Sequence, residues 1–142
     1  QLLISAGADV NRLSHVGDSA LFVACGKRRT EIVRLLLQHP ECNPLVLTKN
    51  GNSALWTAAQ HNASDELLDS CLQRIPVDLA DASGRTPLMV ACAAASVRVV
   101  RKLLDARANV NAQDREGKLS PLAYVVRDSA SRMVRPEPGK DD

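Results

Sequence analysis

The sequence predicts an all-α solenoid of stacked helix-turn-helix units that are joined by β-hairpin-like loops. A glycine recurs at separations of 34, 33 and 33 residues, and a leucine follows each glycine four or five residues later. The recurring residues are Gly17, Gly51, Gly84 and Gly117, with Leu21, Leu55, Leu88 and Leu122. A single sequence unit repeated in this way indicates an array in which each copy stacks on its neighbours.

Each unit is predicted to open with a first helix. A hydroxyl residue stands before a helix-compatible run in every copy, and its side chain can accept a hydrogen bond from an N–H group of the first turn. In two copies a proline follows, which the first helical position tolerates because the N–H there has no helical partner. The expected N-caps are Ser19, Ser53, Thr86 and Ser120, and the prolines are Pro87 and Pro121.

A second, amphipathic helix is predicted after the first helix of each full unit. Residues 31–37 and 97–104 place apolar side chains at spacings of three and four. The middle unit departs from this pattern, because Ser70 and Cys71 stand where the other units have a pair of leucines. We expect its second helix to be loosely packed or shifted by one residue.

Several motifs carry a resemblance to a known repeat. Gly84 to Leu88 reads Gly-Arg-Thr-Pro-Leu, and Leu103-Leu104 with Ala108 to Asn111 closes the same unit. Related closing motifs occupy Gly7 to Asn11 and Val77 to Asp81. With a period of 33 residues, these motifs resemble the ankyrin repeat over roughly residues 2 to 126. The resemblance implies a module that binds other proteins and is not itself an enzyme.

The repeat divides the chain into units. Because the chain begins inside a half unit, we expect it to be a fragment of a longer protein. The expected divisions are the closing half of a preceding repeat (1–13), three full ankyrin repeats (14–47, 48–80 and 81–113), a partial capping repeat (114–134) and a disordered tail or linker (135–142).

Loop positions depart from the ankyrin pattern in two ways. Pro40, Arg74 and Arg107 occupy the place where the resemblance implies a left-handed glycine. We expect a cost of roughly 1 kcal/mol for each non-glycine residue held there, unless the turn changes type. The fourth unit has one extra residue between Gly117 and Pro121.

Composition excludes several classes of function. The 142 residues are 45% hydrophobic and 24% charged, and 18 Lys+Arg against 16 Asp+Glu give a net charge of +2. This balance disfavours nucleic acid and acidic membranes as partners, and the basic trio 27–29 is interpreted as a solvated helix end. The sequence contains neither an apolar run long enough to span a bilayer nor a signal peptide pattern.

No residue pattern predicts catalysis, a cofactor or a metal site. Cys25 and Cys92 fall at the same repeat position and are expected to be small buried residues of first helices. Cys42 and Cys71 lack a Cys-x-x-Cys partner, so the thiols are expected to be reduced, in the cytoplasm or nucleus. His39 and Cys42 are three apart but have no further ligands nearby.

A binding surface is predicted from the resemblance. Ankyrin arrays generally bind proteins through their hairpin tips and the exposed side of their first helices, which implies a concave strip. Its charge is mixed, with an apolar middle near Ala93 and Ala94, which favours an extended peptide or protein loop. Trp56 is assigned to core packing first and to partner contact second. The predicted strip comprises His15, Val16, Asp18, Lys27, Lys49, Asn50, Asn52, Trp56, Gln60, His61, Ala82, Ser83, Arg85, Arg115, Glu116 and Lys118.

The resemblance has two further implications. Asn11 and Asn111 match the position at which ankyrin repeats can be hydroxylated, although a structural role in the turn is favoured for both. As a whole, the chain is predicted to be a monomeric interaction module of a scaffold or adaptor. One alternative is a substrate-recruiting or regulatory arm of an enzyme such as a ubiquitin ligase or kinase, and a second is a structural spacer.

Overall fold

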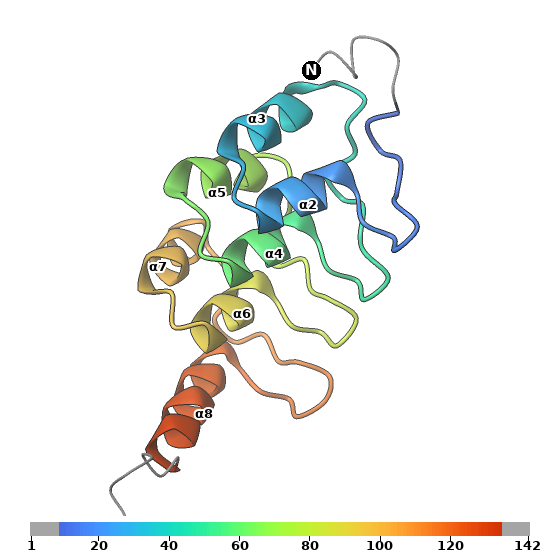
Figure 1. The fold of residues 1–142 in the computed structure, drawn as a ribbon. Helices are drawn as coiled ribbons and strands as arrows, with labels where there is room; N and C mark the ends of the chain where they lie inside the picture. The colour runs from blue at the N-terminus through green and yellow to red at the C-terminus, as the bar shows by residue number, and fades with distance from the viewer. Residues whose placement is uncertain (1–8, 135–142) are drawn as a thin grey trace, which may run out of the picture.

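The computed structural model describes residues 9–134, and side chains through residue 127 (Figure 1). The expectations for residues 1–8 and for the tail 135–142 therefore lie outside the described residues. The described part is helical and contains no strand. Its helices are α2 (Ala20–Gly26), α3 (Thr30–Gln38), α4 (Ala54–Gln60), α5 (Asp65–Leu72), α6 (Pro87–Ala93), α7 (Val97–Asp105) and α8 (Pro121–Val134).

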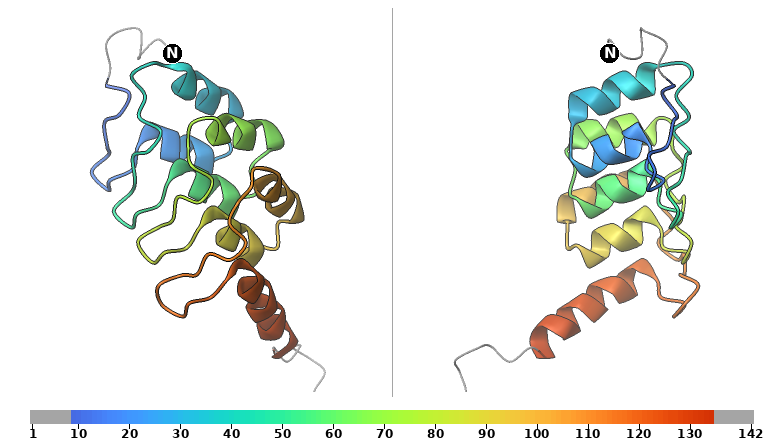
Figure 2. Two further views of the ribbon diagram at one scale, coloured as in Figure 1. Left: turned by 180° about the vertical axis from the view of Figure 1, so that it is seen from behind. Right: turned by 45° about the vertical axis from the view of Figure 1, so that its right-hand side comes forward.

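The helices stack in two columns. First helices α2, α4, α6 and α8 follow one another in one column, and second helices α3, α5 and α7 form the other (Figure 1). The hairpin loops project together on one side of the stack, as both views of Figure 2 show. Each unit contacts mainly its neighbours, which is the packing expected of a solenoid. The prediction of an all-α repeat solenoid is confirmed.

The predicted starts of the first helices are confirmed. In every unit the hydroxyl of the N-cap accepts from the backbone N–H three residues later, and Pro87 and Pro121 are the first residues of α6 and α8. The hydroxyl oxygens of Ser19, Ser53, Thr86 and Ser120 lie 3.1, 3.0, 3.3 and 3.4 Å from the amide nitrogens of Phe22, Trp56, Met89 and Ala123.

The second helix of the middle unit is shifted and tightly packed. Helix α5 begins after the N-cap Ser64, one residue later in the repeat than α3 and α7 begin. This shift turns Leu67, Leu68 and Cys71 inward, and each has 0% exposure. The expectation of loose packing is therefore wrong, and the one-residue shift is confirmed.

Of the three loop positions expected to be left-handed, only one is, and other left-handed residues lie in turns between helices. Arg107 is left-handed, with φ of 66°, but Arg74 and Pro40 are not. The ring of proline fixes φ at a negative value, and Arg74 instead continues the end of α5, with its N–H donating to Cys71 O. The turns between first and second helices hold further left-handed residues, which are Arg28, Asn62 and Ala95.

Each hairpin is closed by the same contacts. The residue that opens the hairpin donates its N–H to the carbonyl of the residue that ends it, and its side chain accepts the N–H of that ending residue. The opening and ending residues are Ser14 and Asp18, Thr48 and Asn52, Asp81 and Arg85, and Asp114 and Leu119.

The glycines supply the left-handed turn in three of these hairpins. Gly17, Gly51 and Gly84 have φ of 89°, 79° and 80°. At Gly51 a Cβ atom would lie 2.7 Å from the backbone nitrogen of Ala82, so a side chain there would clash with the next hairpin. In the fourth hairpin the extra residue moves the left-handed position from Gly117 to Lys118, whose φ is 52°.

All four cysteines are buried and unbridged. Cys25 and Cys92 lie in first helices with 0% and 7% exposure, which confirms that prediction. The structure also brings Cys25 Sγ to 3.7 Å from Cys71 Sγ, a proximity that the sequence did not predict. This neighbouring thiol and burial both raise the pKa of Cys25. Across residues 9–134, none of the helices combines the length and apolarity needed to cross a bilayer.

Candidate functional site

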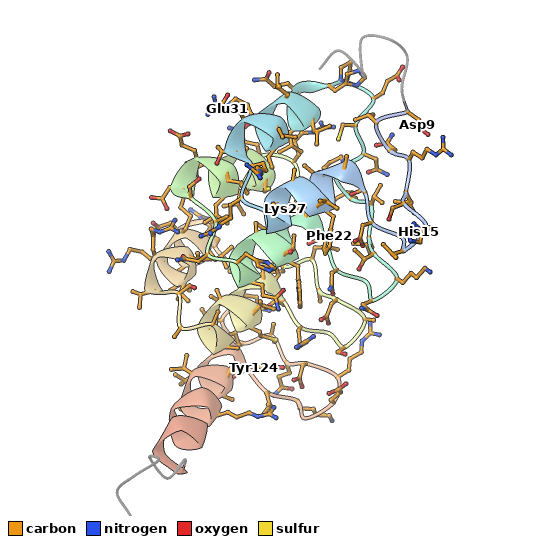
Figure 3. The ribbon with its side chains drawn as sticks, viewed as in Figure 1. Asp9, His15, Phe22, Lys27, Glu31 and Tyr124 are labelled. Carbon is orange, nitrogen blue, oxygen red and sulfur yellow. The ribbon has the colours of Figure 1, made fainter. Side chains whose placement is uncertain are left out.

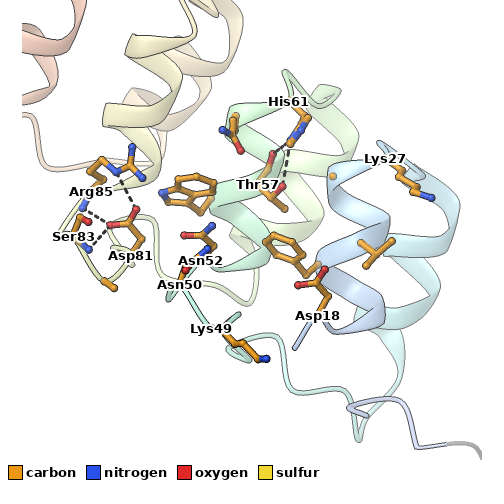
Figure 4. A pocket seen from close by; sticks show the side chains of 16 residues that line it. Asp18, Lys27, Lys49, Asn50, Asn52, Thr57, His61, Asp81, Ser83 and Arg85 are labelled. Carbon is orange, nitrogen blue, oxygen red and sulfur yellow. Dashed lines mark hydrogen bonds and ion pairs between the residues drawn. The ribbon is translucent and has the colours of Figure 1, made fainter. Parts of the chain in front are cut away.

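A hollow of about 750 Å³ lies on the concave side of the stack, across the three full units (Figure 4). Its walls come from first helices α2 and α4 and from the hairpins before α4 and α6. We call it the concave hollow. The predicted strip residues that line it are Asp18, Lys27, Lys49, Asn50, Asn52, Trp56, Gln60, His61, Ala82, Ser83 and Arg85.

Two aromatic side chains form the apolar part of the hollow. Phe22 of α2 and Trp56 of α4 occupy equivalent repeat positions, and both line the hollow. Trp56 is 5% exposed, which agrees with its first assignment, to packing, and its contact with a partner stays a prediction. The guanidinium carbon of Arg85 lies 5.5 Å from the centre of the indole ring, within range of a cation–π interaction.

Arg85 is oriented by a buried carboxylate. Its Nε lies 3.0 Å from Asp81 Oδ2, and the side chain of Asp81 is 2% exposed. The other carboxylate oxygen of Asp81 accepts the backbone N–H groups of Ser83 and Arg85, each at 2.9 Å (Figure 4). A carboxylate that is satisfied by its own hairpin can hold a cation in one place, so Arg85 is a prearranged donor at the wall.

Other polar side chains of the hollow remain available. Lys27 and Lys49 are exposed, and neither makes an ion pair within residues 9–127. Asn50 and Gln60 are exposed as well. His61 differs, because its Nδ1 lies 2.9 Å from the carbonyl oxygen of Thr57 and 3.3 Å from the hydroxyl of the same residue. The hollow therefore offers cations and amides around an aromatic floor.

The remaining strip residues lie beyond the hollow. His15 and Val16 are exposed in the first hairpin, away from the hollow, and Figure 3 shows His15 on the loop side of the stack. Arg115, Glu116 and Lys118 belong to the fourth hairpin. Glu116 Oε1 accepts from the Ser83 hydroxyl at 3.3 Å, so this hairpin continues the strip. The structure thus separates a central hollow from two exposed ends.

Some lining residues were missed by the sequence analysis. They are Phe22, Val23, Gly26, Thr57 and Asp81. Val23 and Thr57 are equivalent positions, one residue after the aromatic position. Helical spacing of four residues from Phe22 would have found Gly26. Asp81 carried a weaker signal, because it was assigned only to the closing motif of the preceding unit.

Asn11 is engaged in a structural contact. Its amide nitrogen donates to Glu41 O at 2.7 Å, and its amide oxygen accepts from Asn43 N at 2.7 Å. At the end of the second unit, Asp78 makes the corresponding contact with the third unit, because its Oδ1 accepts from Asn109 N at 2.9 Å. These contacts agree with the structural role favoured for Asn11. Hydroxylation of Asn11 and Asn111 stays a prediction.

The described residues contain no group of three or more His, Cys, Asp or Glu side chains that could hold a metal ion. A hydrogen-bonded pair of titratable side chains with shifted pKa values lies outside the hollow. Tyr124 donates to Asp114 Oδ2, and burial together with this hydrogen bond raises the pKa of Tyr124 to about 12. The same hydrogen bond lowers the pKa of Asp114. This pair fixes α8 to its hairpin.

The fold and the hollow define a class of protein. Helix pairs stacked in two columns, with a concave face of hairpins and first helices, are the architecture of helical repeat proteins that present an extended binding surface. A family model described as ankyrin repeats in three copies matches residues 1–70, 41–114 and 57–135. The chain belongs to the ankyrin repeat family, which confirms the resemblance.

The chain is similar to parts of much longer proteins. It is 28% identical over 138 residues to mouse Rabankyrin-5, which covers 95% of the chain and 12% of that protein. It is 32% identical over 117 residues to the mouse B-cell lymphoma 3 protein homolog, covering 80% of the chain and 26% of the relative. Zebrafish ankyrin repeat and SAM domain-containing protein 6 is 28% identical over 116 residues, covering 80% and 16%. Ankyrin repeats are in general protein–protein interaction modules.

Proposed function

We propose that this ankyrin array binds an extended peptide segment or loop of another protein, and that the concave hollow is its central contact. The hollow itself carries the proposal, because three consecutive units contribute to one concavity of about 750 Å³. An extended segment that crosses successive hairpins could contact all three units at once.

The chemistry of the hollow supports a peptide more than a polyanion. Binding energy in protein interfaces is concentrated in aromatic and arginine side chains with polar surroundings. Here Trp56, Phe22 and Arg85 lie together, and Asn50 and Gln60 flank them. The cations of the hollow are interspersed with Asp18 and these amides, so the surface suits alternating apolar and polar side chains of a peptide.

Affinity capture with paired baits tests the proposal. One bait carries Lys49→Ala and Gln60→Ala, which remove two exposed side chains of the hollow. The matched control carries Arg101→Ala in α7 and Gln73→Ala just after α5, which remove the same kinds of exposed side chain outside the hollow. We expect partners of the unmodified chain to be retained by the control and lost by the hollow variant, with thermal unfolding unchanged in both.

The same experiment separates the alternatives. An identical set of partners on all three baits would contradict the placement of the site in the hollow. If no partner is retained by any bait, the structural spacer becomes the better hypothesis. Partners that include an enzyme's substrates would favour a substrate-recruiting arm.

A further inference from the structure

The concave hollow contains two buried polar atoms without partners. They are Trp56 Nε1, a donor, and Asn52 Oδ1, an acceptor, and neither finds a hydrogen-bond partner in the described part of the chain. They are the two such side-chain atoms found among residues 9–127, and both residues line the hollow. Trp56 is 5% exposed and Asn52 is half-buried.

The two atoms have complementary hydrogen-bonding roles. Asn52 directly precedes Ser53, the N-cap of α4, and Trp56 lies in the first turn of that helix, so both residues line the hollow at the start of one helix. A buried donor or acceptor that is left without a partner costs stability, and natural structures contain few of them. A group that presents one acceptor and one donor would satisfy both.

We propose that the hollow recognises an amide of the bound peptide, whose carbonyl oxygen accepts from Trp56 Nε1 and whose N–H donates to Asn52 Oδ1. This inference rests on the proposed function, because it specifies the chemistry of the same site. An Asn or Gln side chain carries this acceptor and donor on one edge of its carboxamide. The C=O and N–H of one trans backbone amide point in opposite directions, so an extended backbone would instead offer the C=O and N–H of one residue, from two successive amides. A carboxylate has no N–H to donate to Asn52.

Arg85 is the side chain that we expect to move when the amide enters. Both unpartnered atoms are closed to solvent, so a neighbouring group must turn aside. The guanidinium of Arg85 lies over the indole at 5.5 Å, and 42% of the Arg85 side chain is exposed. Because its ion pair with Asp81 restrains it, turning the guanidinium toward solvent has an energetic cost that the bound peptide must offset.

Selection from a library of short displayed peptides tests the inference. The library is panned on the unmodified 142-residue chain after depletion on the Lys49→Ala, Gln60→Ala variant, so that the retained peptides depend on the hollow. Each retained peptide is then measured against Asn52→Leu, which removes the acceptor at similar volume. Asn111→Leu, which makes the same exchange at an exposed position outside the hollow, is the matched control. We expect Asn52→Leu to weaken binding about tenfold and Asn111→Leu to leave it within about twofold.

Two further readouts keep a structural role apart from recognition. Asn52→Leu removes an unsatisfied acceptor, so we expect its melting temperature to be equal to or above that of the unmodified chain. The chain has one tryptophan, so its indole N–H gives a single NMR signal of its own. Retained peptides should shift this signal downfield, as a new hydrogen bond does. Alanine scanning of each peptide identifies the source of the amide. If it is an Asn or Gln side chain, replacing that residue abolishes the shift; if it is the backbone, no single replacement abolishes it.

The outcomes are separable. Peptides that depend on the hollow, yet bind Asn52→Leu equally well and leave the indole signal in place, overturn the amide and leave the proposed function standing. A lowered melting temperature for Asn52→Leu also overturns it, because Asn52 Oδ1 would then be satisfied within the protein. Failure to retain any peptide after depletion overturns both the inference and the proposed function.

Discussion

Polar side chains on the outer face and on the concave face of the same units differ in the ion pairs that they make. On the outer face, second helices are joined to the next unit by ion pairs. Concave side chains such as Lys27 and Lys49 make no ion pair among the described residues, and Trp56 Nε1 has no hydrogen-bond partner there. The outer pairs are Arg34 with Glu66 at 3.3 Å, Arg98 with Asp65 at 2.7 Å and Lys102 with Asp69 at 2.7 Å.

This difference separates stability from binding. The units are joined by contacts in the helix columns, between hairpins and across the outer face, whereas Lys27, Lys49 and Trp56 Nε1 of the concave face have no such partner among residues 9–127. Substitutions on the two faces should therefore change different measured quantities. The following predictions test that separation, from the largest expected effect to the smallest.

The largest effect is expected in the second helix of the middle unit. Leu68→Ala should lower the free energy of unfolding by about 3 kcal/mol, because Leu68 has 0% exposure and its loss leaves a cavity between columns. Urea denaturation followed by circular dichroism measures the change. A loss under about 1 kcal/mol would show that α5 is loosely packed after all.

The buried pair at the end of the stack gives a pH dependence. Burial and the hydrogen bond to Asp114 raise the pKa of Tyr124 to about 12 from its ordinary value of 10.0. Because the pKa of Tyr124 is higher in the folded than in the unfolded state, the buried hydroxyl contributes its full stability below the pKa of the unfolded chain. That contribution is lost as the pH rises toward 12. Tyr124 is the single tyrosine of the chain, so tyrosinate absorbance reports it alone.

Asp114→Asn provides the control for this titration. The variant keeps the burial of Tyr124 but removes the negative charge beside its hydroxyl. The apparent pKa of Tyr124 should then fall below the native value and stay above that of a solvated tyrosine. A native titration near pH 10 would contradict the buried contact.

A smaller effect is expected where Arg74 crosses between units. Its guanidinium donates to Leu37 O at 2.6 Å and to Cys42 O at 3.1 Å, both in the preceding unit. Arg74→Ala should cost about 2 kcal/mol, because two carbonyls lose a charged donor. Gln73→Ala, at an exposed neighbouring position, is the control and should change stability by less than about 0.5 kcal/mol. If the two variants lowered the free energy of unfolding equally, Arg74 would not be a contact that stabilises the joining of units.

The smallest effects compare a paired cation with an unpaired one. Arg98→Ala should cost at most about 1 kcal/mol, and less in high salt, because its contacts with Asp65 and Asn62 are exposed. Lys49→Ala should leave stability unchanged within about 0.5 kcal/mol and weaken peptide binding. If Lys49→Ala destabilises the fold more than Arg98→Ala does, the separation between the two faces fails.

Local signals explain why much of the fold was predictable. A hydroxyl N-cap acts on residues within one turn, so Ser19, Ser53 and Thr86 mark their helices without any tertiary information. The start of α5 was left open by the repeat alignment, although its N-cap is also local: the Ser64 hydroxyl accepts from Leu67 N at 3.3 Å, and Ala63 before it has no side-chain acceptor. Pro40 and Arg74 were misassigned because turn type depends on the backbone around it, which the repeat alignment does not encode.

The candidate site was predictable in position more than in chemistry. The repeat period places Lys49, Gln60 and Arg85 on one face, and the structure gathers them around one hollow. The pairing of Arg85 with Asp81 and the lack of partners at Asn52 depend on side-chain geometry. A sequence pattern does not show which buried polar atoms lack a hydrogen-bond partner.

The fourth hairpin shows where this kind of array can change length. It closes from Asp114 N to Leu119 O at 3.1 Å although it holds one residue more than the hairpin from Asp81 to Arg85. Helix α8 still begins at a proline and still contacts α6. An inserted codon in a hairpin therefore alters the binding face and spares the helix stack. Hairpins are the positions at which natural variation or a grafted sequence can change specificity without a new fold.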